Sequence, residues 1–273
     1  MKTFTSWIKQ HALLVFYVLA VALSWWPWWL YVKGIGNFPP ILPLGPLLAV
    51  LIVVPLASGW AGVKAFVRST FRWRVGLHWY AIAVGFPIVV SGAAAGLNIL
   101  LGATYTALVL PVSLTAVLLA ILDMFLWVGL GEEAAWSAFA LPHLLRRRSL
   151  LATVLILGSM RILWHLPLFM TGQQHWAIAV VLIPLQLIAT WLFLRGRGSA
   201  FLVILVHLSQ NVLGSIFFSL FTGPDQVRMN WLYAAVFVIT TAALLLASKS
   251  LRTVLLAPET AVSSDAEVAI NPL

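Results

Sequence analysis

Two adjacent carboxylates and two histidines lie inside long apolar stretches of this chain. Glu132 and Glu133 fall within an apolar run covering residues 114–145, and two later apolar runs carry His165 and His207. Ionisable groups inside membrane-length apolar runs are costly to bury and are commonly functional. Because the three runs should form separate helices, the sequence predicts a polar site assembled between helices.

These residue types suit hydrolysis of an amide bond. A carboxylate in a low-dielectric pocket holds a proton more readily than one in water, so Glu132 could accept a proton from water near neutral pH. His165 could orient the same water or protonate a leaving amine. His207 and Asn211 are four residues apart and share a helix face, so together they could donate hydrogen bonds to a developing oxyanion.

A metal-dependent version of the same site stays open. Glu132, His165 and His207 with Asn211 could ligate zinc, because imidazole and carboxylate groups suit this ion. The chain has no His-Glu-x-x-His motif, which favours a site without metal. The sequence therefore assigns no cofactor, with zinc as the alternative.

The composition decides the class of protein. Of the 273 residues, 62% are apolar and 8% are charged, and continuously apolar windows recur along the chain. This pattern predicts a polytopic α-helical membrane protein and excludes a β-barrel, whose strands would be short and alternating. The formal charge of +9 is explained by membrane topology without nucleic acid. The absence of cysteine excludes disulfides, cysteine nucleophiles and thiolate metal sites.

Apolar windows predict about eight transmembrane helices, with the polar site between the central ones. The fourth is expected to extend to residue 145. The predicted spans are 12–32, 41–57, 79–101, 112–139, 150–170, 177–194, 200–221 and 231–247. Within the fifth span, Pro167 cannot donate a hydrogen bond to the carbonyl of Leu163 and should kink the helix beside His165. Irregular backbone at membrane depth lines protein or water, as a hydrolytic site requires.

The basic residues predict the orientation in the cell membrane. If the N-terminus is cytoplasmic, the outside segments hold only Lys33 and Arg228, and Arg161 is intramembrane. The cytoplasmic segments then hold Lys2, Lys9, Lys64, Arg68, Arg72, Arg74, Arg146, Arg147, Arg148, Arg195, Arg197, Lys249 and Arg252. This asymmetry predicts that both termini are cytoplasmic.

Four regions follow from this pattern. Residues 1–110 hold the N-terminal helices and a cytoplasmic segment, residues 111–221 the catalytic core, residues 222–257 the last helix, and residues 258–273 a polar, disordered tail. Residues 58–78 fit an amphipathic surface helix and an ordinary basic loop equally well. The first span could instead be a signal peptide, but its Trp-rich end favours an uncleaved anchor.

Three motifs in order resemble the CPBP intramembrane proteases, which include type 2 CAAX prenyl endopeptidases and bacterial proteins linked to bacteriocin processing and immunity. The first is the Glu132-Glu133 pair followed by Ser137, where the family has Glu-Glu-x-x-x-Arg, and then by Phe-Ala-Leu-Pro at residues 139–142. The second places Arg161 four residues before His165, where the family has an aromatic residue. The third is His207-x-x-x-Asn211. The resemblance covers roughly residues 115–220.

The resemblance implies an intramembrane endopeptidase acting on a membrane-associated substrate, such as a prenylated or leader-bearing peptide. By resemblance, Glu132 would be the general base and His165 its partner. His207 and Asn211 would stabilise the oxyanion, and Glu133 would be supporting. Membrane lipids and the peptide substrate are the implied partners.

The two departures from the family motifs point in different directions. The loss of arginine at Ser137 favours an alternative, in which the chain is an inactive family member that binds a membrane or peptide partner, as an immunity protein would. The arginine gained at position 161 suggests that the charge moved to another helix. Arg161 lies one turn before His165, so its guanidinium could reach Glu133 in the pocket. A proton-coupled transporter is disfavoured, because no paired half-helix breaks are visible in the sequence.

Overall fold

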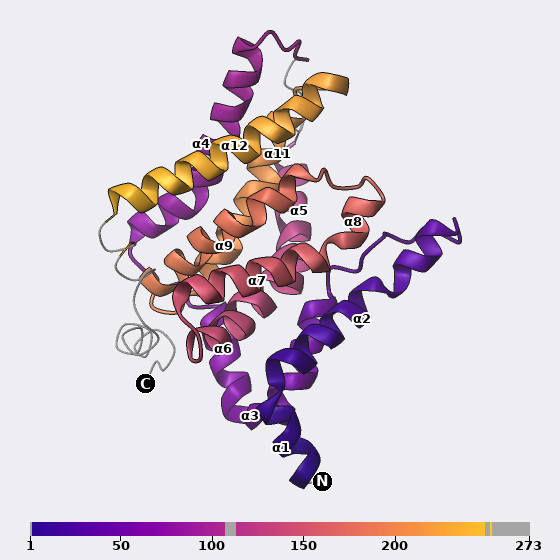
Figure 1. The fold of residues 1–273 in the computed structure, drawn as a ribbon, viewed down its shortest axis with the longest axis vertical. Helices are drawn as coiled ribbons and strands as arrows, with labels where there is room; N and C mark the ends of the chain where they lie inside the picture. Colours follow the sequence, from indigo (N-terminus) through magenta and orange to yellow (C-terminus); the bar gives the residue numbers. More distant parts are fainter. Residues whose placement is uncertain (1, 107–112, 249–251, 253–273) are drawn as a thin grey trace.

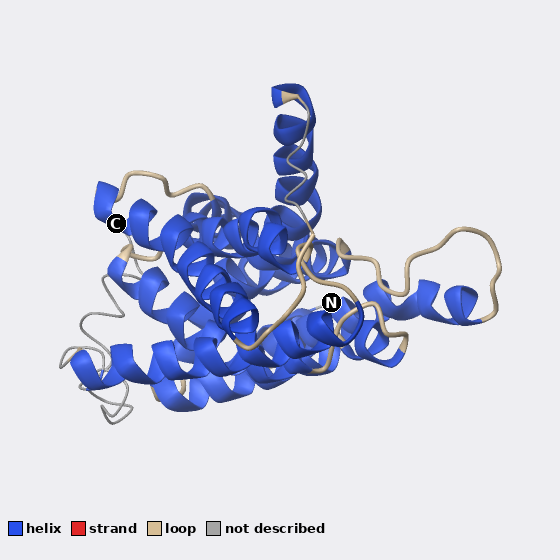
Figure 2. Cartoon of the chain, turned by 90° about the horizontal axis from the view of Figure 1, so that it is seen from above, coloured by secondary structure: helices blue, strands red, loops and turns tan. Residues whose placement is uncertain are grey.

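The computed structural model describes residues 2–106, 113–248 and 252, and this part of the chain is helical without a strand (Figure 2). The helices are α1 (Lys2–Gln10), α2 (Ala12–Val32), α3 (Gly45–Thr70), α4 (Leu77–Leu100), α5 (Leu114–Met124), α6 (Leu141–Leu145), α7 (Leu150–Trp164), α8 (Leu166–Met170), α9 (Ala177–Arg195), α10 (Ala200–Ser209), α11 (Ser215–Phe218) and α12 (Gly223–Ala247). Three π-helical segments interrupt them: η1 (Phe125–Glu133), η2 (Trp136–Ala140) and η3 (Gln210–Gly214). The predicted tail, residues 258–273, lies outside the described residues.

The prediction of an all-α integral membrane protein is confirmed. In the described part of the chain, seven helices are long and apolar enough to span a membrane. They correspond to seven of the eight predicted spans, including a continuous Leu114–Leu145 segment of 32 residues. The remaining predicted span, residues 150–170, corresponds to α7, which is apolar but only 15 residues long. The chain is therefore a multi-pass membrane protein.

The predicted span over residues 150–170 is not one continuous helix. Helix α7 ends at Trp164, and α8 begins at Leu166 with Pro167 in its first turn. The carbonyl oxygen of His165 accepts hydrogen bonds from the backbone N–H groups of Leu168 and Phe169, which closes the start of the new helix. The break predicted beside Pro167 is thus present, because Pro167 has no N–H group to donate to the carbonyl of Leu163.

Two other regions can be compared with the predicted boundaries. The helix break expected after residue 57 is present at Gly59, whose φ of 59° is non-helical and favours glycine, and α3 resumes beyond it to Thr70. Beyond the kink, Phe66 and Thr70 are buried and Lys64 is exposed, so this half of α3 is amphipathic up to residue 70. Helix α12 begins at Gly223, eight residues before the predicted start at 231, because Pro224 in its first turn suits a helix N-terminus.

The buried apolar residues form two main clusters that meet at α10. One cluster joins α1, α2 and α3 to η2 and α6, and the other joins α4, α9 and α12. Helix α10 contributes Val203 and Ile204 to the first cluster and Leu202 and Val206 to the second. Figure 1 shows α2 beside α3 and α12 beside α4, at opposite sides of the bundle. The residues around α10 are therefore enclosed from both sides.

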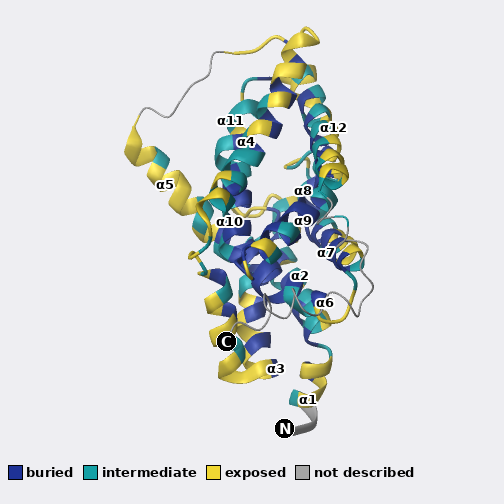
Figure 3. Cartoon of the chain, turned by 90° about the vertical axis from the view of Figure 1, so that its left-hand side faces the viewer, coloured by how far each residue is buried: buried dark blue, intermediate teal, exposed yellow. Residues whose placement is uncertain are grey.

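Helix α5 differs from the central helices because it has no buried residue. It stands apart from the bundle and is exposed along its length (Figure 3). Its exposed side chains include Leu118, Leu119 and Leu122, as expected for a surface facing lipid. The same segment then enters the core, where residues 131–140 are all buried. This change from lipid-facing to buried occurs at the carboxylate pair.

Candidate active site

Four of the candidate residues lie in or beside π-helical turns. Glu132 and Glu133 end η1, Ser137 lies in η2, and Asn211 lies in η3. π-helical turns are rare and occur frequently at functional sites, because the extra residue per turn changes the direction of the following side chains. The site is therefore built on irregular backbone within otherwise apolar helices.

Two glycines let η1 approach its neighbours closely. A Cβ atom at Gly129 would lie 2.9 Å from the Cγ2 atom of Ile204 in α10, and one at Gly131 would lie 2.9 Å from the carbonyl oxygen of Pro43. Any larger residue would push these segments apart. The sequence Gly-Leu-Gly before Glu132 thus allows the carboxylate pair to be buried between α10 and the chain preceding α3.

Glu133 is saturated with hydrogen bonds. Its Oε1 atom accepts hydrogen bonds from the Ser137 hydroxyl at 2.6 Å and from Nη1 of Arg161 at 3.1 Å. Its Oε2 atom accepts from Nη2 of Arg161 at 2.8 Å and from Nδ1 of His207 at 2.9 Å. The side chain is 1% exposed, so these four bonds replace its hydration. Both oxygens of Glu133 are therefore occupied by hydrogen bonds, and neither is free to accept a proton from water.

The predicted pairing of Arg161 with Glu133 is confirmed. The guanidinium contacts both carboxylate oxygens from a different helix, α7, and is itself buried. A fork of two charge-assisted hydrogen bonds is the strongest geometry for this type of pair. Ser137, which replaces the family's arginine, contributes a hydroxyl to the same carboxylate. The positive charge beside Glu133 is thus present, although it comes from α7.

Two residues that the sequence analysis missed extend this network. Gln186 in α9 is fully buried, and its Oε1 atom lies 3.4 Å from Nη1 of Arg161. Its Nε2 group donates to the Thr190 hydroxyl at 3.2 Å, and this hydroxyl donates to the Gln186 carbonyl at 2.7 Å. The sequence signal was an amide inside the apolar run of residues 177–194, where polar groups need partners.

His207 is oriented by the saturated carboxylate. A carboxylate accepts hydrogen bonds, so Nδ1 of His207 donates to Glu133, and Nε2 points to the other side of the ring. Asn211 follows one turn later, is half-buried, and has no side-chain hydrogen bond to another described residue. When Nε2 carries a proton, both side chains can donate to an oxygen atom of a bound substrate.

His165 lies at the break between α7 and α8, which orients its side chain. Its Nδ1 atom lies 2.7 Å from the carbonyl oxygen of Arg161, which can only accept a hydrogen bond. Nδ1 therefore carries the proton, and Nε2 is available to accept one. The buried imidazole packs edge-on against Trp164 and near Phe169, with ring centroids at 4.8 Å and 6.2 Å. The aromatic contacts fix the plane of the ring.

Glu132 contrasts with its neighbour. It is 6% exposed, and its Oε2 atom is buried without a hydrogen-bond partner in the described part of the chain. His207 and Arg161 lie within electrostatic range of this carboxylate. No hydrogen bond joins Glu132 to His165, so the two groups do not contact each other directly. An unpaired buried carboxylate is the group in this network that is available for proton transfer.

The predicted ligands do not form a metal-binding set. Within residues 2–106, 113–248 and 252, no three His, Asp or Glu side chains are grouped closely enough to hold a metal ion. His207 and His165 each direct Nδ1 at a protein acceptor, and both Nε2 atoms are left free. This orientation is compatible with metal ligation, so only the spacing of the side chains argues against a ligand set. The zinc alternative lacks a ligand set in this structure, so we assign no step to a metal.

Helix α2 closes the site on one side through aromatic residues. The indole N–H of Trp164 donates to the Ser24 hydroxyl at 2.9 Å, and the indole N–H of Trp25 donates to the Trp164 carbonyl at 2.9 Å. The rings of Trp136 and Trp164 meet edge to face, with centroids 6.1 Å apart. These contacts join α2, η2 and α7 around the carboxylate network.

Comparisons with known proteins agree with the motifs. Residues 113–213 match the family model described as type II CAAX prenyl endopeptidase Rce1-like. The chain is also similar to "CAAX prenyl protease 2" from Methanococcus maripaludis, with 28% identity over 104 residues. This alignment covers 34% of the chain and 38% of the archaeal protein. Residues 113–213 contain all five candidate catalytic residues and Arg161, so the family-model match includes the site.

Proposed function

We propose that this chain is an intramembrane endopeptidase of the type II CAAX protease kind, in which Glu132 activates water. The observation that carries the proposal is the contrast between two adjacent carboxylates. Glu133 accepts four hydrogen bonds, whereas the Oε2 atom of Glu132 accepts none from the described residues. One carboxylate thus organises the site, and the other is left for chemistry.

The reaction follows from the free atoms of each side chain. Glu132 takes a proton from water while the water oxygen bonds to the carbonyl carbon of the substrate. With His207 in its doubly protonated form, Nδ1–H stays on Glu133, and Nε2–H donates to the oxyanion together with the amide of Asn211. The proton held by Glu132 then passes to the leaving nitrogen, and the C–N bond breaks. His165, through Nε2, accepts a hydrogen bond from the same water and aligns it.

Glu133 and Arg161 act as positioning residues for both histidines. Glu133 holds Nδ1 of His207 directly, and the backbone carbonyl of Arg161 holds Nδ1 of His165. Because the Arg161 side chain is bound to Glu133, the two histidines are linked through one buried ion pair. Their relative positions therefore depend on a contact that makes no bond to the substrate.

The substrate class is proposed from the relative's name. "CAAX prenyl protease 2" is the description of the archaeal protein, and we propose that this chain likewise cleaves a peptide carrying a lipidated cysteine near its C-terminus. Purified protein in lipid nanodiscs should release the C-terminal fragment of a farnesylated peptide over time, as measured by mass spectrometry. The same peptide without the farnesyl group is the control and should be cleaved more slowly. Equal rates would refute prenyl recognition.

The inactive alternative can be judged by the same assay. This alternative was raised because Ser137 stands where the motif has arginine. The guanidinium of Arg161 nevertheless contacts Glu133, the carboxylate to which Ser137 donates a hydrogen bond. An inactive relative would bind the lipidated peptide without releasing a fragment. Prolonged incubation with bound peptide and no product would therefore favour a binding or immunity function over catalysis.

We further propose that the site opens to the cytoplasmic half of the cell membrane. Because the chain contains no cysteine, each introduced thiol is unique. Arg147→Cys and Arg195→Cys should react with a membrane-impermeant maleimide only after cells are opened, as the positive-inside distribution predicts. Gln173→Cys and Thr222→Cys should react in intact cells. The reverse labelling pattern would place the basic segments outside.

A further inference from the structure

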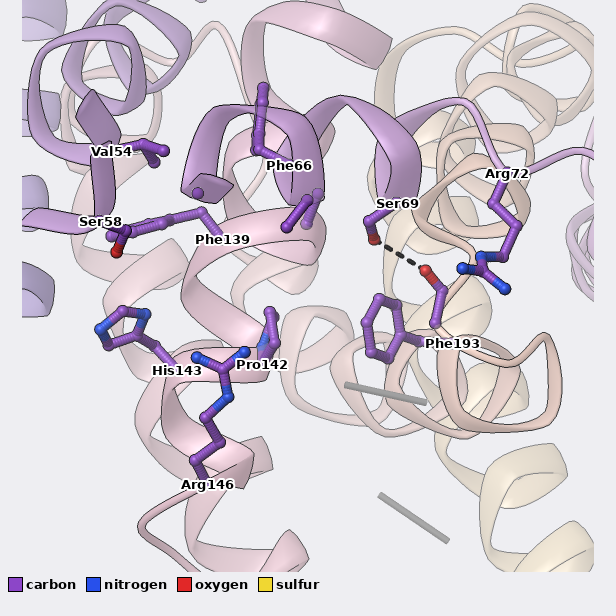
Figure 4. Close-up of a pocket in the computed structure, with 14 residues that line it drawn as sticks. Val54, Ser58, Phe66, Ser69, Arg72, Phe139, Pro142, His143, Arg146 and Phe193 are labelled. Carbon is purple, nitrogen blue, oxygen red and sulfur yellow. Dashed lines mark hydrogen bonds between the residues drawn. The ribbon is translucent and has the colours of Figure 1, made fainter. Parts of the chain in front are cut away.

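A cavity lies away from the carboxylate network, at the end of the bundle where α3 and α6 terminate. Its volume is about 90 Å³. Figure 4 shows that it is enclosed by the kinked half of α3, by the α6 segment and by the end of α9. No residue of the candidate active site lines it. The cavity is therefore a separate site.

Two arginines reach into this cavity from different segments. Arg72 comes from the connection after α3, and Arg146 comes from the end of α6 on the other side of the cavity, with His143 beside it (Figure 4). The Nε atom of Arg72 is buried and has no hydrogen-bond partner among the described residues. The hydroxyl groups of Ser58 and Ser69 also lie on the wall. A buried guanidinium donor without a partner indicates a missing acceptor.

In the described part of the chain, no acidic side chain balances the positive charge of the cavity. Among the described residues, the acids are Asp123 on α5, Glu132 and Glu133 in the active site, and Asp225, which pairs with Arg228 at 2.9 Å. None of them lines the cavity. Burial lowers the pKa of Arg72, and the neighbouring Arg68 and Arg197 lower it further.

The remaining wall of the cavity is apolar. Val54, Phe66, Phe139 and Phe193 form it, and Phe193 lies beside the hydrogen bond from Ser69 to Gly198 (Figure 4). Arg72 and Arg146 each follow directly after an apolar span, Gly45–Thr70 and Leu114–Leu145, respectively. Residues at these positions lie near the headgroup layer of a membrane. The cavity thus combines cations with an apolar surface at the depth of lipid headgroups.

We propose that this cavity binds the phosphate-bearing headgroup of an anionic phospholipid. The Arg72 guanidinium binds the phosphate oxygens, because its planar fork of N–H donors matches phosphate geometry, and Arg146 attracts the same negative charge from the other side of the cavity. The apolar wall accommodates the glycerol and the first acyl carbons. Basic pockets between helices at the membrane surface recognise anionic headgroups in this way. The site links α3, α6 and α9, and its occupancy is independent of the peptidase activity.

Lipid binding by the full-length purified protein tests the proposal. Native mass spectrometry should show retained phosphatidylglycerol in preference to phosphatidylcholine when both are offered in equal amounts. The Arg72→Gln/Arg146→Gln variant should bind phosphatidylglycerol about thirtyfold more weakly, from roughly fivefold per arginine. Because Arg146 is exposed, Arg146→Gln alone should keep the fold and lose about fivefold, which gives a second measurement.

The control variant has the same change in charge outside the cavity. Lys64→Gln/Arg74→Gln alters two exposed residues near the same end of the bundle and should change phosphatidylglycerol binding by less than about twofold. An equal loss in this variant would overturn the proposal in favour of diffuse surface charge. Inorganic phosphate should compete weakly, since it lacks the apolar part. Strong competition by phosphate alone would show a free-anion site and overturn the assignment to lipid.

Discussion

Replacing Arg161 with leucine should lower the free energy of unfolding by about 3–5 kcal/mol, because it leaves the Glu133 carboxylate buried without its charged partner. The ion pair is almost entirely shielded from solvent, with side-chain exposures of 2% for Arg161 and 1% for Glu133. Chemical denaturation in detergent micelles would measure the change. The peptidase rate should also fall, because Glu133 would no longer hold His207 firmly.

A matched arginine serves as the control for this result. Arg228 pairs with Asp225 and donates to Asn98, but its side chain is 39% exposed, so Arg228→Leu should cost about 1–2 kcal/mol, less than Arg161→Leu. Adding Ser137→Arg to the Arg161→Leu protein should restore part of the stability and the activity, because position 137 already lies within hydrogen-bond reach of Glu133. Parent-like stability of Arg161→Leu would contradict the role of the ion pair. A double variant no better than the single one would refute the idea that the charge was relocated.

The second large effect is expected for His165 and His207, the two proposed catalytic histidines. His165→Ala and His207→Ala should each reduce kcat/KM by about a hundredfold or more, since one loses the group that aligns water and the other an oxyanion donor. Initial rates at several concentrations of the lipidated peptide would measure this. Glu133→Gln should have a smaller effect on the chemical step, because Glu133 acts through His207.

Two checks make the histidine result specific. His11→Ala should retain the parent rate, because His11 bonds only to the nearby Trp7 carbonyl and stacks on its ring, away from the site. Thermal unfolding should show that the two active-site variants are still folded. A folded His207→Ala protein with the parent rate would remove His207 from the mechanism, and the same outcome for His165→Ala would remove the water-aligning role.

Much of the fold was predictable because a helix that spans a membrane needs about 20 consecutive apolar residues, which are visible in the sequence. Seven predicted spans correspond to long apolar helices, and the break beside Pro167 followed from its missing N–H group. The amphipathic helix after Gly59 could not be separated from a basic loop, because both fit a glycine followed by basic and aromatic residues. The π-helical turns were also missed, since their backbone register depends on contacts with distant segments and leaves no periodicity in the sequence.

The candidate site was only partly predictable. The pairing of Arg161 with Glu133 could be inferred from spacing. Arg161 lies one helical turn before His165, so its side chain was expected to face the same pocket as Glu133. The contrast between Glu132 and Glu133 could not be read from two identical adjacent residues. It arises from donors on three other segments, α7, α10 and η2. Gln186 was missed for the same reason, since its partner lies on another helix.

The most direct test of the account is the rate at which purified Glu132→Gln protein cleaves the farnesylated peptide, compared with the parent protein in the same nanodiscs. Glutamine keeps the size of the side chain but cannot accept a proton from water. We expect release of the C-terminal fragment to fall by about a hundredfold or more, with unchanged thermal unfolding and retained peptide binding. Cleavage by folded Glu132→Gln at the parent rate would contradict the assignment of Glu132 as the general base.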